Sequence, residues 1–152
     1  MKLGVLKEPE GETRVAIVPT SLKKLQKAGF EVVIEAGAGT AANYHDAEYE
    51  EAGATVGTRD DALACETIIT IRFPGVEGMK EGTNLACVSD PFRNPQYVKD
   101  CLASNITLLS MDMIPRRLSR AQSMDVNSSQ DNLAGYKAVL LGAAHVPKGI
   151  PM

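Results

Sequence analysis

The stretch Glu66-Thr67-Ile68-Ile69-Thr70-Ile71 (ETIITI) decides the fold of this 152-residue chain. After the glutamate every residue is β-branched, which is typical of a strand buried inside a parallel sheet. Shorter runs that also favour strands lie at residues 2–6, 31–35, 84–88 and 106–110. The sequence therefore predicts five main strands.

Helical stretches alternate with these strands, at residues 19–28, 46–52, 60–64 and 95–102, and residues 54–56 favour one further short strand. Strands that alternate with helices predict an α/β fold with a mostly parallel sheet. Right-handed crossovers place the helices on both faces of such a sheet. We therefore expect a doubly wound, flavodoxin-like sheet.

The alternation ends after Asp112, where residues 114–132 are polar and have no strand period. Ser129 or Asp131 then has the chemistry of a helix cap. We accordingly divide the chain into a domain of residues 1–130 and a helix with a linker over residues 131–152.

The helix predicted after this cap is amphipathic, with Leu133, Tyr136, Leu140 and Ala144 on one side. An apolar side of this kind needs something to pack against. We expect it to face a further domain or a second copy of the chain, which favours a homodimer.

Composition excludes several classes of protein. The net charge is −3 and charges of both signs are interspersed, so we expect no nucleic-acid partner. Three cysteines and two histidines, all widely spaced, predict neither a disulfide framework nor a metal site. No apolar run reaches the ~20 residues of a membrane span, and the acidic start is unlike a signal peptide. We expect a cytoplasmic chain.

One glycine motif imitates a dinucleotide site. Residues 37–42 (GAGTAA) follow a strand and match G-x-G-x-x-A, the pattern that admits a pyrophosphate to a helix N-terminus. However, the preceding strand is the second of its unit, and a turn at residues 43–46 stands where the helix should open. We interpret the motif as a tight glycine turn.

Residues 116–130 concentrate guanidinium, amide, carboxylate and hydroxyl groups. An amide and a carboxylate suit the carboxamide of a nicotinamide ring, and an arginine suits phosphate. A solvated loop leading to a helix cap would have the same composition. Composition alone leaves both interpretations open.

The sequence around this segment resembles a known family. Residues 119–125 (SRAQSMD) and 132–139 (NLAGYKAV) closely resemble the alpha subunits of proton-translocating NAD(P) transhydrogenases. Residues 4–8 (GVLKE) and 12–16 (ETRVA) resemble the opening that these subunits share with alanine dehydrogenases. The resemblance covers essentially the whole chain.

The resemblance implies a mobile loop that holds the nicotinamide of NAD(H). Gln122 and Asp125 match its Gln and Asp, and Ser128 matches a nearby hydroxyl contact. Because this chain is one residue longer after Pro115, either Arg116 or Arg117 can match the loop arginine; we favour Arg117, which keeps its spacing to Gln122.

The implied function is that of the N-terminal part of the NAD(H)-binding component, which positions the nicotinamide for hydride transfer from NADH to NADP⁺. NADP(H) would lie on a partner component, and a membrane component would make the chain peripheral to the membrane. The Rossmann domain that follows in the family lies beyond this sequence, so we expect the isolated chain to bind NAD(H) weakly and to be inactive.

Two alternatives remain: a non-catalytic regulatory or scaffolding module, and a fragment of an alanine dehydrogenase-like enzyme. The substrate site of alanine dehydrogenases resembles an arginine, a lysine and a histidine, and Arg14 matches the arginine. Arg72 replaces the lysine, and residues 89–92 (SDPF) contain no histidine. An amino-acid site without its acid–base group has no mechanism, which favours a structural role for Arg14.

Overall fold

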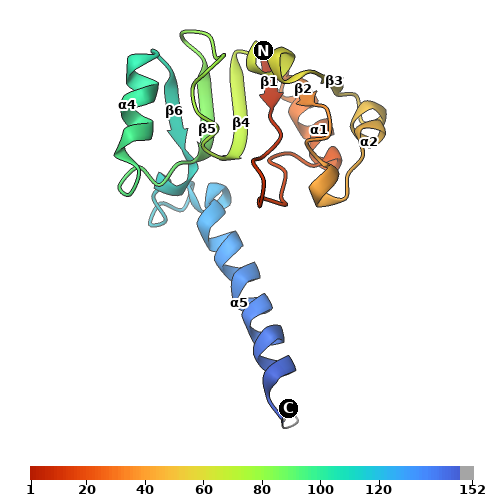
Figure 1. Cartoon of the computed structure of the whole chain (residues 1–152), viewed down its shortest axis with the longest axis vertical. Helices are drawn as coiled ribbons and strands as arrows, with labels where there is room; N and C mark the ends of the chain where they lie inside the picture. The colour runs from red at the N-terminus through yellow and green to blue at the C-terminus, as the bar shows by residue number, and fades with distance from the viewer. Residues whose placement is uncertain (148–152) are drawn as a thin grey trace. The chain divides into compact units, whose positions relative to one another are not determined.

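The computed structural model describes residues 1–147; residues 148–152, part of the predicted linker, lie outside the described residues. The chain forms two compact units, Met1–Ser110 and a second unit that begins at Met111. The first unit contains these strands and helices in chain order: β1 Lys2–Val5, α1 Pro19–Lys27, β2 Glu31–Glu35, the 3₁₀ turn η1 Thr40–Ala42, α2 Asp46–Glu51, β3 Thr55–Gly57, α3 Arg59–Leu63, β4 Thr67–Arg72, β5 Asn84–Val88, α4 Pro95–Ala103 and β6 Thr107–Ser110 (Figure 1).

The six strands form one sheet in the order β3-β2-β1-β4-β5-β6, and every pairing is parallel. This confirms the predicted α/β class, with a sheet that is wholly rather than mostly parallel. The five main strands alone follow the 2-1-3-4-5 order of a flavodoxin-like sheet. The three-residue strand β3 pairs with the outer side of β2 and extends this order to 3-2-1-4-5-6.

Helices cover the sheet from both faces, as expected for a doubly wound fold. On one face, Leu22 of α1 and Tyr49 of α2 pack in a core with Val5. On the other face, Ala62 of α3 and Cys101 of α4 pack in a second core. The strands feed both cores because successive side chains of a strand point to opposite faces.

Gly4 lies in β1 opposite α3, at the closest approach of a helix to the sheet. A Cβ added at this position would overlap the carbonyl oxygen of Ala62 and lie 2.9 Å from its carbonyl carbon. Only a residue without a side chain allows α3 to pack this closely on the central strand.

The helix ends follow the local sequence signals. Pro19 occupies the first turn of α1, where its missing N–H removes no helical hydrogen bond. After the cap residue Ala28, Gly29 adopts φ +86°, a left-handed conformation that ends the helix and directs the chain into β2. The predicted elements of the first unit therefore match the structure to within two residues at each end.

The second unit begins with two 3₁₀ turns, η2 Met111–Met113 and η3 Gln122–Met124, and continues with the long helix α5 Val126–His145. The predicted helix start at Ser129 or Asp131 was wrong. Asp125 caps the helix instead, because its carboxylate accepts a hydrogen bond from the Ser128 amide. Residue 130, the predicted domain boundary, therefore lies inside α5, and the family-based division there stays a prediction.

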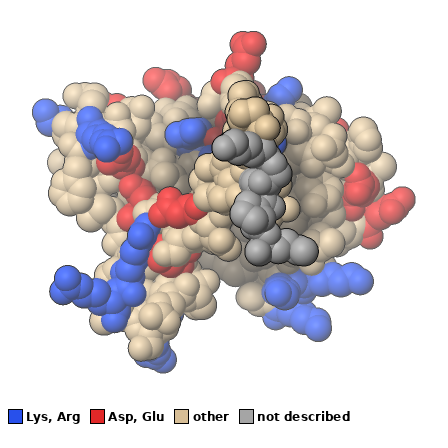
Figure 2. Space-filling view, turned by 90° about the horizontal axis from the view of Figure 1, so that it is seen from below, with Lys and Arg blue, Asp and Glu red and all other residues tan. Residues whose placement is uncertain are grey.

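Among residues 1–147, no helix is both long and apolar enough to cross a membrane. On α5 the large apolar side chains are exposed, including Leu133, Tyr136 and Leu140 at 61%, 67% and 48%. In the face of the molecule that Figure 2 shows, acidic and basic side chains are both spread over the surface.

Candidate functional site

The predicted site residues all lie in the second unit, on the segment that leads into α5. Gln122 begins the turn η3, Asp125 caps α5, and Ser128 lies in the first turn of that helix. Arg117 precedes them in a turn after Pro115. All of these residues except the half-buried Asp125 are exposed. The segment is therefore anchored at Asp125 and accessible elsewhere.

Asp125 and Ser128 are the two site residues that contact each other directly. Asp125 Oδ1 accepts from the Ser128 amide at 2.9 Å, and Oδ2 accepts from the Ser128 hydroxyl at 2.6 Å. These hydrogen bonds, helped by the positive charge of Arg116, lower the pKa of Asp125 below its usual value. Asp125 is consequently ionised at neutral pH, and it acts as a hydrogen-bond acceptor rather than as an acid.

Arg116 also engages Asp125, a contact that motif matching did not identify. Its Nε lies 3.6 Å from Asp125 Oδ2, and its Nη2 lies 3.5 Å from Asp131 Oδ2. The side chain of Asp125 is 10% exposed, whereas that of Asp131 is 73% exposed. The pair of adjacent arginines was visible in the sequence, but which of them pairs with the helix could not be read from it.

Gln122 is joined to Asp125 through the backbone, since its carbonyl oxygen accepts from the Asp125 amide at 3.3 Å. The structure gives no hydrogen bond or ion pair from the side chains of Gln122 or Arg117 to other described residues. The site residues therefore lie on one short segment, with an anchored carboxylate and with amide and guanidinium groups directed to solvent.

A second polar site lies in the first unit, where the strand order reverses between β1 and β4. Ligands of doubly wound sheets commonly bind beyond the carboxyl ends of the strands at this point. A cleft of about 650 Å³ opens here. It is lined by Pro9, Glu10, Gly11, Glu12, Arg72, Phe73, Val88, Ser89, Asp90, Asn94 and Tyr97.

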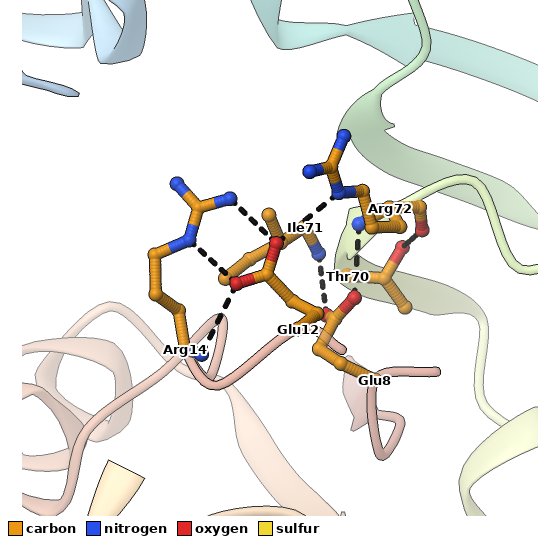
Figure 3. A network of polar contacts seen from close by, with 6 residues as sticks. All are labelled: Glu8, Glu12, Arg14, Thr70, Ile71 and Arg72. Atoms are coloured by element: carbon orange, nitrogen blue, oxygen red, sulfur yellow. Dashed lines mark hydrogen bonds and ion pairs between the residues drawn. The ribbon is translucent and has the colours of Figure 1, made fainter. Parts of the chain in front are cut away.

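Glu8 joins the loop after β1 to the end of β4 (Figure 3). Its two carboxylate oxygens accept from the backbone amides of Ile71 at 2.6 Å and Arg72 at 2.9 Å. Here the pairing of β4 with β5 shifts register, and the Thr70 hydroxyl bonds the Arg72 carbonyl at 2.7 Å. Burial raises the pKa of Glu8, although the two amide hydrogen bonds oppose this effect. Glu8 therefore holds the end of β4 and orients Arg72.

Glu12 pairs with both arginines of the cleft region (Figure 3). Its carboxylate accepts from Arg14 Nε at 2.7 Å, from Arg14 Nη2 at 2.6 Å and from Arg72 Nε at 3.1 Å. The hydrogen bonds from Arg14, more than any other cause, lower the pKa of Glu12 to about 2. The guanidinium groups that could bind a substrate carboxylate thus already share an internal one.

The rest of the cleft is aromatic and polar. The rings of Phe73 and Tyr97 stack with centroids 4.2 Å apart. The Ser89 hydroxyl lies 2.8 Å from that of Ser110, and the Asn94 amide donates to the Ser89 carbonyl. The lining residues include no histidine or lysine. This arrangement does not favour the alanine dehydrogenase-like alternative.

The glycine motif of residues 37–42 forms a turn, as interpreted from the sequence. It leads into the three-residue turn η1 and then into Asn43 at φ 62°, so no helix N-terminus opens toward a phosphate. A Cβ added at Gly39 would lie 2.6 Å from the Tyr49 ring. This glycine admits a buried tyrosine, whose hydroxyl donates to the Ile17 carbonyl at 3.0 Å.

Potential metal ligands are not grouped in the part of the chain that the structure describes. No three residues among its histidines, cysteines, aspartates and glutamates lie close enough to hold an ion. The cysteines Cys65, Cys87 and Cys101 are all buried and unbridged.

The chain is similar to proteins of known name. It is 41% identical over 163 residues to the first part of the NAD(P) transhydrogenase alpha subunit of Rhodospirillum rubrum, covering 100% of this chain and 42% of that protein. The crystal structure of transhydrogenase from Sinorhizobium meliloti matches with a TM-score of 0.93 and 40% identity, covering 100% of this chain and 47% of that one. An L-alanine dehydrogenase structure matches with a TM-score of 0.72 and 26% identity, covering 80% of this chain and 34% of the other.

The chain thus spans less than half the length of these relatives. A family model described as alanine dehydrogenase/PNT, N-terminal domain, matches residues 4–134, which include the whole first unit after Leu3 and the predicted site residues. The chain therefore belongs to the alanine dehydrogenase/PNT N-terminal domain family.

Proposed function

We propose that this chain is the N-terminal part of the NAD(H)-binding component of a proton-translocating NAD(P) transhydrogenase. In this proposal the segment from Arg117 to Ser128 positions the nicotinamide for hydride transfer from NADH to NADP⁺. The main support is the anchored Asp125 carboxylate, with the Gln122 and Arg117 side chains directed to solvent on the same short segment.

The donors and acceptors of this segment fit a nicotinamide. Asp125 is ionised and can accept from a carboxamide NH₂, while the Gln122 amide can donate and accept. Ser128 adds a hydroxyl, and Arg117 adds a planar cation suited to phosphate or to ordering the segment. The nicotinamide itself supplies the hydride, so the residues need only orient it against an acceptor.

Further components complete the proposal. The relatives named transhydrogenase are more than twice as long as the matched region, which supports a following NAD-binding domain of Rossmann type. The Rhodospirillum rubrum relative is named as one part of a divided alpha subunit, which supports partner components that bind NADP(H) and span the membrane. The chain would then be cytoplasmic and peripheral to the membrane through its partners, and the exposed apolar side chains of α5 support a homodimer or a domain contact.

The proposal is tested by substitution in the complete assembly. Asp125→Asn keeps a good helix cap but removes the charge, and Gln122→Ala removes the amide. We expect each variant to lower the hydride-transfer rate by about tenfold or more, the cost of losing a hydrogen bond to a well-held ring. Ser123→Ala, a change at the exposed neighbour of Gln122, is the matched control.

Unchanged transfer in both Asp125→Asn and Gln122→Ala would leave a regulatory or scaffolding module as the better interpretation. Thermal unfolding of each variant must match that of the wild-type chain, because a rate lost through misfolding would say nothing about positioning.

A further inference from the structure

Arg116 and Arg117 are adjacent in sequence but differ in what they contact. The guanidinium of Arg116 lies within 3.6 Å of Asp125 and within 3.5 Å of Asp131. Arg117 is exposed, and no ion pair joins it to the residues that the structure describes. Since the second unit contains both arginines and both aspartates, the difference belongs to its own local structure.

The contacts of Arg116 connect two points of α5. Asp125 is the cap of the helix, and Asp131 lies in its second turn. One guanidinium that bridges both carboxylates holds the segment before the cap against the side of the helix. At 3.5–3.6 Å these contacts are longer than strong charge-assisted hydrogen bonds, so they orient the carboxylate without closing it off.

The hydrogen bonds of Asp125 leave room for a ligand. Its Oδ2 accepts from the Ser128 hydroxyl and faces Arg116, whereas its Oδ1 accepts from the Ser128 amide. Each carboxylate oxygen has two acceptor positions, so Oδ1 retains one for a further donor. Arg116 and Ser128 together determine where that position points.

We infer that Arg116 is a positioning residue that holds the Asp125 carboxylate, and that Arg117 is the arginine which contacts the nucleotide. This division of roles rests on the proposed function, and it assigns distinct tasks to two side chains that sequence matching could not separate. The additional residue after Pro115 thus supplies an internal partner for Asp125 and leaves a second guanidinium to bind the nucleotide.

The first arm of the test uses NMR of the chain without any nucleotide. The carboxyl carbon of Asp125 is titrated in Arg116→Gln, Arg116→Lys and Arg117→Gln. We expect the midpoint to rise in Arg116→Gln, to return toward the wild-type value in Arg116→Lys, and to stay unchanged in Arg117→Gln. Lys137→Gln, on the exposed part of α5, is the control for loss of one positive charge.

The Nε–H resonance of each arginine provides a reciprocal measurement. Asp125→Asn and Asp131→Asn should shift the resonance of Arg116 and not that of Arg117. The inference is overturned if Arg117→Gln moves the Asp125 titration as much as Arg116→Gln does. It is equally overturned if the Asp125 midpoint moves no more in Arg116→Gln than in Lys137→Gln.

The second arm uses the complete assembly and separates this inference from the proposed function. Arg117→Gln should raise the KM for NADH by about tenfold, as expected for a lost charged hydrogen bond. Arg116→Gln should lower kcat with a smaller change in KM, and Arg116→Lys should restore it. Reversed effects of the two arginines overturn the division of roles. If neither Arg117→Gln nor Asp125→Asn alters transfer, the proposed function fails, whereas the NMR result on Arg116 stands independently.

Discussion

Glu12→Gln is the most informative single substitution in the first unit. Glu12 accepts hydrogen bonds from Arg14 and Arg72, and its side chain is 8% exposed. Glutamine has the same shape and keeps one carbonyl oxygen, but it replaces the second acceptor by an NH₂ group that faces a guanidinium. The change therefore removes the central negative charge and places two donors opposite each other.

The size of the effect follows from the pKa of Glu12, which lies at about 2 instead of 4.5. At 1.36 kcal/mol per pKa unit, the difference sets an upper limit of about 3 kcal/mol on the contribution of the charge to folding. The side chains of Arg14 and Arg72 are 43% and 61% exposed, so water screens part of this energy. We expect Glu12→Gln to lower the free energy of unfolding by about 1–2 kcal/mol at pH 7.

The sign of the pH dependence follows from the direction of the shift. Because the folded-state pKa of Glu12 is lowered, its stabilisation is present above pH 4.5 and is lost as the pH falls toward about 2. The difference between wild type and Glu12→Gln should therefore shrink in acid. Glu8 has a raised pKa and acts in the opposite direction, but it is present in both proteins and largely cancels from the difference.

Urea unfolding followed by circular dichroism, at several pH values between 7 and 3, measures this difference directly. Glu10→Gln, at an exposed glutamate two residues earlier, is the matched control and should cost less than about 0.5 kcal/mol at any pH. A Glu12→Gln cost that is equal at pH 7 and pH 3 would refute an electrostatic origin. A variant as stable as wild type at pH 7 would show that the two arginines do not need this carboxylate.

Three further outcomes are expected. Gly4→Ala should destabilise the chain by about 3 kcal/mol or more in urea unfolding, because the new methyl overlaps the Ala62 carbonyl oxygen. NADH-fluorescence titration of the 152-residue chain should give an affinity weaker than micromolar, since the polar segment offers contacts for the nicotinamide end alone. Sedimentation velocity should show concentration-dependent self-association that Leu140→Glu weakens, because Leu133, Tyr136 and Leu140 are exposed on α5.

The parallel sheet could be predicted because its strands have a distinctive local composition. The β-branched run before Phe73 forms β4, with its neighbours β1 and β5 on either side. Proline at the start of α1 and glycine after its end mark that helix equally well. Elements specified by their own residues were thus predicted to within two residues.

The start of α5 could not be predicted because three residues compete to cap it. Asp125, Ser129 and Asp131 all have suitable side chains, and local sequence does not rank them. In the structure Asp131 is engaged by Arg116, and the Ser129 hydroxyl donates to the Val126 carbonyl. The cap at Asp125 is decided by contacts up to 15 residues apart, beyond what helix signals describe.

The role of Glu8 was equally hidden from the sequence, although it directly follows the first strand. Its amide partners Ile71 and Arg72 lie 63 and 64 residues away, and they become neighbours only because β4 pairs with β1. Strand order is a property of the whole sheet. A position just beyond the carboxyl end of a central strand was the one available signal that Glu8 would lie near the cleft.

The contrast between the two polar sites indicates where a ligand binds. A site must offer groups whose hydrogen bonds are completed by the ligand, because displacing an existing partner costs the energy of that partner. In the cleft, Glu12 already satisfies both Arg14 and Arg72. On the segment before α5, the side chains of Gln122 and Arg117 face solvent while Asp125 is held in place. The cleft is thus built to hold the loop after β1 on the sheet, whereas the segment retains the binding capacity that a nicotinamide requires.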